Sequence, residues 1–62
     1  MSAASQLSSM STSLTELTGR LSKLAEELEG TEQDGLATAL YEVERSLEAA
    51  SRRLEQVLTD LG

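Results

Sequence analysis

The sequence predicts an all-α fold, in which two long amphipathic helices form an antiparallel, coiled-coil-like hairpin. Three observations support this prediction. The 62 residues include no Pro, the residue that breaks a helix most strongly. Apolar residues recur in two heptad series, one in each half of the chain, and a break that contains glycine separates the two series. A chain of this length holds one domain, and we assign residues 1–62 to a single helical hairpin.

The first predicted helix covers about residues 3–29. Its apolar residues alternate in spacing between three and four, which places them on one side of an α-helix as the a and d positions of a heptad repeat. This series consists of Leu7, Met10, Leu14, Leu17, Leu21, Leu24 and Leu28.

The second predicted helix covers about residues 32–61 and shows the same alternation. Its apolar series consists of Leu36, Leu40, Val43, Leu47, Ala50, Leu54, Val57 and Leu61. The two series do not join in phase, because the first one would place apolar residues where Thr31 and Gly35 stand. The helix is therefore interrupted between them.

The predicted turn at residues 30–31 has the composition of one helix end followed by a helix start. Gly30 lacks a Cβ atom and suits the left-handed conformation that ends many helices. Thr31 is a favourable N-cap, and Asp34 stands at the position that Glu or Gln holds in a capping box. We therefore expect the chain to reverse here.

Such a reversal places the two apolar series opposite each other. The numbers of facing residues add up to 64, as for Leu28 with Leu36 and Leu7 with Val57, and each layer pairs an a residue with a d residue. The two series together form the predicted hairpin seam. The alternative is one bent helix of about 60 residues that dimerises as a long coiled coil, but the mirrored spacing and the capping residues favour the hairpin.

A second interface is predicted because one seam makes a marginal fold. Ordering each residue opposes folding by about 1.5 kcal/mol, and a single leucine seam returns a similar amount or less. The residues beside the seam are mostly small, and the candidate interface consists of Ala4, Ser11, Thr18, Ala25, Ala37, Tyr41, Ser51 and Leu58. We expect a homodimer of hairpins that forms a four-helix bundle, or a helical protein partner. The alternative is that these residues only cover an exposed helix surface.

The residue types argue against catalysis. Cys and His are absent, and nothing near the Ser and Thr residues would activate a hydroxyl as a nucleophile. The acidic residues around the turn could form a weak cation site, but they lack the spacing of an EF-hand, and helix capping explains them better. We therefore expect a non-enzymatic structural or protein-interaction module with no catalytic residue, cofactor or metal.

The charge and hydropathy patterns bear on partners and location. A formal net charge of −6 disfavours binding to phosphate backbones and anionic membranes. No apolar run reaches membrane-spanning length, and the N-terminal residues lack the pattern of a signal peptide. We expect a cytoplasmic protein with neither a nucleic-acid nor a membrane partner. The Ser- and Thr-rich first 15 residues resemble lipid-packing-sensor helices, which keeps a membrane-surface sensor as the third hypothesis.

A regulatory hairpin that binds a nucleotide or RNA is the second hypothesis. Three of the five basic residues, Arg45, Arg52 and Arg53, lie in the second helix and could contact an anion. Arg52, Gln56 and Asp60 follow one another at intervals of four. This spacing resembles part of the cyclic-di-GMP-binding signature of actinobacterial anti-sigma helical hairpins. The upstream Glu and Ser of that signature correspond to Arg45 and Ala49 here.

In size and architecture the chain also resembles the plasmid repressor-of-primer family, on the leucine heptads that flank its acidic turn. The hairpins of that family dimerise into a four-helix bundle, so the resemblance implies the same assembly. The family binds paired RNA loops through a basic and aromatic surface. The matching surface of the first helix here carries Ser, Thr, Glu16 and Lys23, so the resemblance implies the architecture alone.

Overall fold

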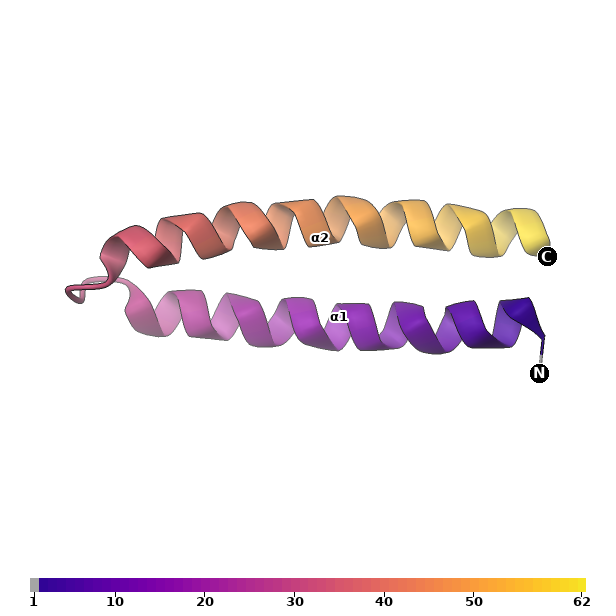
Figure 1. Cartoon of the computed structure of the whole chain (residues 1–62), viewed down its shortest axis with the longest axis horizontal. Coiled ribbons are helices and arrows are strands. Elements are labelled where there is room, and N and C mark those ends of the chain that lie inside the picture. The colour runs from indigo at the N-terminus through magenta and orange to yellow at the C-terminus, as the bar shows by residue number, and fades with distance from the viewer. Residues whose placement is uncertain (1) are drawn as a thin grey trace.

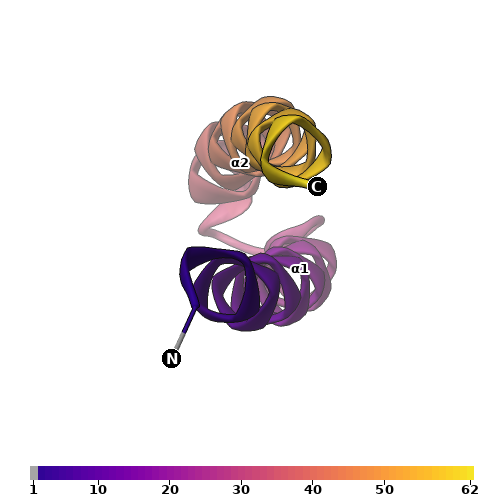
Figure 2. The ribbon, with the colours of Figure 1, turned by 90° about the vertical axis from the view of Figure 1, so that its right-hand side faces the viewer.

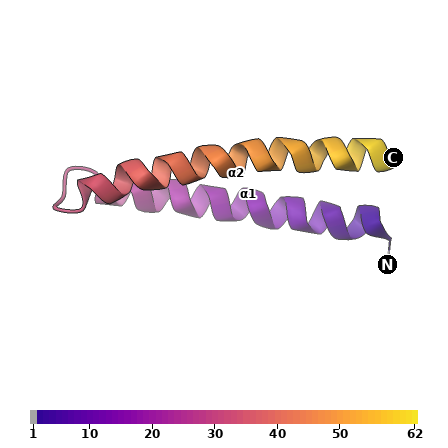
Figure 3. The ribbon, with the colours of Figure 1, turned by 45° about the horizontal axis from the view of Figure 1, so that its top comes forward.

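The predicted all-α hairpin is confirmed by a computed structural model, which describes residues 2–62. Helix α1 (Ala3–Leu28) and helix α2 (Asp34–Leu61) pack against each other in antiparallel directions (Figure 1). The end view shows a single layer of two helices with both termini at the same end (Figure 2). In the third view the helices overlap near the turn and lie apart near the termini, because they cross at a shallow angle (Figure 3). The Cα atoms span 46 × 17 × 10 Å, so the molecule is a narrow slab.

Both ends of α1 are capped by local chemistry. Ser2 is the N-cap, and its hydroxyl oxygen accepts a hydrogen bond of 3.1 Å from the backbone N–H of Ser5. At the other end, the N–H of Glu29 donates to the carbonyls of Ala25 and Glu26. Gly30 follows with φ +73°, which confirms the left-handed conformation expected there. This glycine turns the chain out of the helix.

The turn differs from the predicted capping box, and α2 begins at Asp34, two residues later than expected. The Thr31 hydroxyl donates to the carbonyl of Leu28 at 2.6 Å and accepts from the N–H of Gln33 at 3.1 Å. It is therefore not available to cap the N–H of Asp34, which donates to the Thr31 carbonyl instead. The Asp34 carboxylate reaches back to the N–H of Gly30 at 2.9 Å. The two predicted capping side chains thus brace the turn itself.

Replacement of Gly30 by Ala tests the left-handed turn. A Cβ at Gly30 would meet no atom within 4 Å, so the cost arises from the backbone conformation alone. We expect Gly30→Ala to lower the free energy of unfolding by about 1 kcal/mol. Gly19→Ala is the matched control, because Gly19 lies within α1 with equally open surroundings, and it should raise stability by about 0.5–1 kcal/mol. Equal signs for the two variants in urea titrations would contradict this account.

The hairpin has almost no core of its own. Within residues 2–62, the buried hydrophobic residues are Ala25 (0 % exposed) and Ala37 (2 % exposed), and no large side chain is fully buried. Both alanines lie near the turn, where they allow the two helices to approach closely. The leucines between the helices are only half-buried, and other large hydrophobic side chains are exposed.

Candidate functional site: an exposed aliphatic face

The observed seam between the helices is rotated from the predicted one. In α1 it contains one row of leucines and one row of small residues: Leu7, Leu14, Leu21 and Leu28, with Ser11, Thr18 and Ala25. In α2 the leucine row is Leu40, Leu47 and Leu54, and the second row mixes the small Ala37 and Ser51 with the larger Glu44 and Leu58. All of these residues are buried or half-buried. The hairpin therefore closes through half of each heptad series together with the row of small residues beside it.

This arrangement differs from the expected roles of the two surfaces. Seven of the eight candidate interface residues, all except the exposed Ala4, are buried or half-buried within the single chain. Conversely, eight residues of the predicted seam are exposed: Met10, Leu17, Leu24, Leu36, Val43, Ala50, Val57 and Leu61. The physical reason is helix spacing, because small side chains such as Ala25 and Ala37 permit a closer approach than two facing rows of leucine.

The exposed part of the heptads forms one regular surface, which we call the aliphatic face. It consists of Met10, Leu17 and Leu24 in α1 and of Leu36, Val43 and Val57 in α2, with exposed fractions between 46 % and 56 %. The residues of each helix are separated by seven positions or, across the small Ala50, by fourteen. This spacing returns to the same side of a helix, so each set forms a row along its helix.

The two rows lie on the same side of the hairpin. In each helix, the exposed row follows a seam leucine by three residues, as Met10 follows Leu7 and Val43 follows Leu40. The second seam row follows the same leucine by four residues in both helices. Around each helix, the leucine row therefore lies between the exposed row and the second seam row. Because this order is the same in both helices and the helices are antiparallel, their exposed rows lie on the same side of the hairpin. An open groove beside Met10 and Leu17, bordered by Gln6, Ser9 and Ser13, is part of this surface.

Polar residues occupy the opposite side of the hairpin. A groove there is lined by Thr15, Thr18 and Ser51 together with Glu48 and Arg52. The Thr15 and Thr18 hydroxyls donate to backbone carbonyls of their own helix, at 3.1 and 2.8 Å. The hairpin is thus apolar on one side and polar on the other.

Tyr41 is the only aromatic residue, and it links α2 to the end of α1. Its hydroxyl donates to a carboxylate oxygen of Glu29, twelve residues earlier. This hydrogen bond, desolvation and the charges of Glu29, Glu26 and Glu44 raise the pKa of Tyr41 to about 12. The phenol is therefore held in its protonated form beside the acidic turn.

Tyr41→Phe tests this link through the pH dependence of stability. A folded-state pKa above the usual 10.0 means that protonated Tyr41 stabilises the hairpin below pH 10, and that this contribution is lost between pH 10 and about 12. We expect the wild type to exceed Tyr41→Phe in free energy of unfolding at pH 8, and the difference to shrink as the pH rises above 10. Denaturant titrations of both proteins at each pH measure this difference, and a difference that stays constant with pH would contradict the link.

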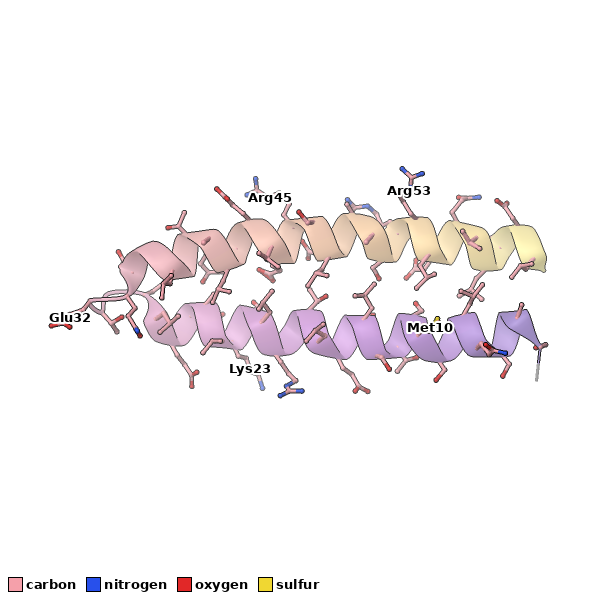
Figure 4. The ribbon with its side chains drawn as sticks, viewed as in Figure 1. Met10, Lys23, Glu32, Arg45 and Arg53 are labelled. Carbon is pink, nitrogen blue, oxygen red and sulfur yellow. The ribbon has the colours of Figure 1, made fainter. Side chains whose placement is uncertain are left out.

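The three arginines of the second hypothesis do not converge on one site. Arg45 and Arg53 extend away from α1 on the outer side of α2, as the side-chain view shows (Figure 4). Arg52 instead lines the polar groove with Glu48. Gln56 donates to Asp60 at 3.2 Å, so these two residues of the four-residue spacing are bonded to each other.

Residues 2–62 contain no group of three or more Asp or Glu side chains arranged to hold a metal ion. Neither α1 nor α2 contains a segment both long and apolar enough to cross a bilayer.

Comparison with protein-family models, curated proteins and solved structures finds no significant match to this chain.

Proposed function

We propose that this chain is a non-enzymatic protein-interaction module that self-associates through its aliphatic face to form a four-helix bundle. The observation that carries the proposal is the exposure of six large aliphatic side chains in two rows on one side of a hairpin whose buried hydrophobic residues are two alanines. Burial of apolar surface is the dominant favourable term in both folding and association. A second layer of helices would supply the burial that the hairpin lacks.

The width of the apolar stripe supports this proposal. Each helix carries three adjacent rows: the aliphatic row, the leucine row and the row of small residues. A helix in a simple two-helix contact needs only the narrower seam of two rows. A helix in a four-helix bundle has two neighbours and needs a broader stripe. In this chain the small and leucine rows contact the other helix of the hairpin, which leaves the aliphatic row for a helix outside it.

A second copy is the occupant that best matches the aliphatic face. The Cα atoms of the hairpin span 46 × 17 Å on its broad side, so a second copy of the same dimensions can cover both rows along their whole length. Its two rows have the same heptad spacing, so an identical face offers rows of matching length and period. The polar side of the hairpin would remain in solvent on both outer surfaces of such a bundle.

Sedimentation of the unmodified chain tests the proposal directly. We expect the mass to rise from one to two chains as the concentration increases, and the helix content measured by circular dichroism to rise in parallel, because each hairpin gains its missing burial on association. A monomer at every concentration would contradict self-association. So would a chain that gains helix only when a different protein is added.

A further inference from the structure

We infer that the second copy packs end over end, so that the acidic turn of each hairpin lies beside the chain termini of the other. This inference rests on the self-association proposed above and adds the orientation of the partner. It is carried by the distribution of charge along the hairpin, because the apolar rows alone accept two orientations.

All of the net charge lies at the turn. Residues 24–42 contain six carboxylates and no Lys or Arg, whereas the rest of the chain contains five acidic and five basic residues. The formal net charge of −6 therefore belongs to this segment, which we call the acidic end. The hairpin folds the segment on itself, since α1 ends at Leu28 and α2 begins at Asp34. Its carboxylates are thus gathered around one tip of a slab 46 Å long, with Glu32 at the extremity (Figure 4).

The acidic end contains one titratable side chain that is not a carboxylate, and the surrounding groups affect its ionisation. Tyr41 lies within the acidic end, and its hydrogen bond to Glu29, desolvation and the charges of Glu29, Glu26 and Glu44 all disfavour ionisation of its hydroxyl. A further negative charge is therefore already unfavourable at this end of a single hairpin.

Two symmetric dimers bring the aliphatic faces together. In one, the turns meet turns, and each aliphatic layer faces the same layer of the other copy. In the other, the long axes are reversed, so that Leu17 remains central while Leu24 faces Met10 and Leu36 faces Val57. The same residues are buried in both dimers, and neighbouring helices are antiparallel in both. Neither apolar burial nor helix dipoles therefore distinguish them.

The charges do distinguish the two dimers. A turn-to-turn dimer would bring two sets of six carboxylates to one end of a bundle, with no basic residue in either set. At physiological ionic strength, charges interact over a Debye length of about 8 Å, which is comparable to the spacing of packed helices. The end-over-end dimer separates the two acidic ends by the length of the hairpin and places each beside the charge-balanced end that contains Arg52 and Arg53.

A distance measurement between spin labels tests the orientation. The chain has no cysteine, so Glu32→Cys provides one labelling site at the tip of the turn, outside the aliphatic face. For the end-over-end dimer we expect an inter-label distance close to the 46 Å length of the hairpin. A distance of about 20 Å, the width of two packed helices, would overturn the inference.

Glu16→Cys is the matched control, because Glu16 is exposed and adjoins Leu17 in the central layer. Its label should give a distance well below the hairpin length in either orientation, which establishes that the labelled chains are dimers. A dimer with a short Glu32→Cys distance would refute the orientation and leave the proposed function intact. Monomeric mass for the labelled and unmodified chains would refute both.

Discussion

Leu17→Glu is expected to abolish self-association and to unfold most of the helix at micromolar concentrations. Leu17 is 49 % exposed in the single hairpin and lies at the middle of the aliphatic face. In a bundle, each copy would bring one unpaired carboxylate into an apolar interface, which costs several kcal/mol. We expect the dissociation constant of the dimer to rise by at least about 100-fold, which corresponds to roughly 3 kcal/mol. Sedimentation and circular dichroism at matched concentrations measure both effects.

Thr12→Glu is the control for this variant. It introduces the same charge into the same helix, at an exposed position outside both the aliphatic face and the observed seam. The Thr12 hydroxyl donates only to the carbonyl of Ser8, one turn earlier. The control should therefore retain the mass and helix content of the wild type. If Leu17→Glu also behaved as the wild type, the aliphatic face would not be an interface.

Ala25→Leu is expected to have the second largest effect, on the stability of the hairpin itself. Ala25 is 0 % exposed, so a side chain with three more carbon atoms has no space unless α1 and α2 move apart. Overpacking of this kind costs about 1–3 kcal/mol. The free energy of unfolding, measured by urea titration, should fall by that amount.

Ala49→Leu is the matched substitution at an exposed position of α2, where the larger side chain meets solvent. It should change stability by less than about 0.5 kcal/mol. An Ala25→Leu protein as stable as the wild type would mean that the helices do not require small residues near the turn.

The hairpin and its turn could be predicted from the sequence because both depend on local patterns. The heptads specify helices with a continuous apolar side, and the phase break beside Gly30 marks the reversal. The predicted start of α2 lies two residues before the observed one, because the Thr31 hydroxyl has two possible hydrogen-bonding roles. In the usual pattern this hydroxyl caps a helix. Here it donates to the carbonyl of Leu28, and the carboxylate of Asp34 accepts a hydrogen bond from the N–H of Gly30. Such competition between local hydrogen bonds is not visible in residue types alone.

The rotation of the seam could not be predicted from the same patterns. Three adjacent rows in each helix share the heptad period, and any two neighbouring rows can face the other helix. The choice depends on how closely the backbones approach, which Ala25 and Ala37 decide through their size rather than their spacing. The sequence therefore identified which residues are apolar and small, while the structure identified which of them are left exposed.

The short connection through residues 29–33 separates the assembly of this chain into two steps of different kinetic order. Tethered so closely, α1 and α2 encounter each other at an effective concentration on the order of millimolar, whatever the amount of protein present. The pairing of two aliphatic faces is instead a bimolecular step that follows mass action. If the bundle forms as proposed, the rate at which the chain is synthesised and degraded is enough to set the balance between hairpin and bundle. Its abundance would then serve as the regulatory signal, with no need for a ligand or a covalent modification.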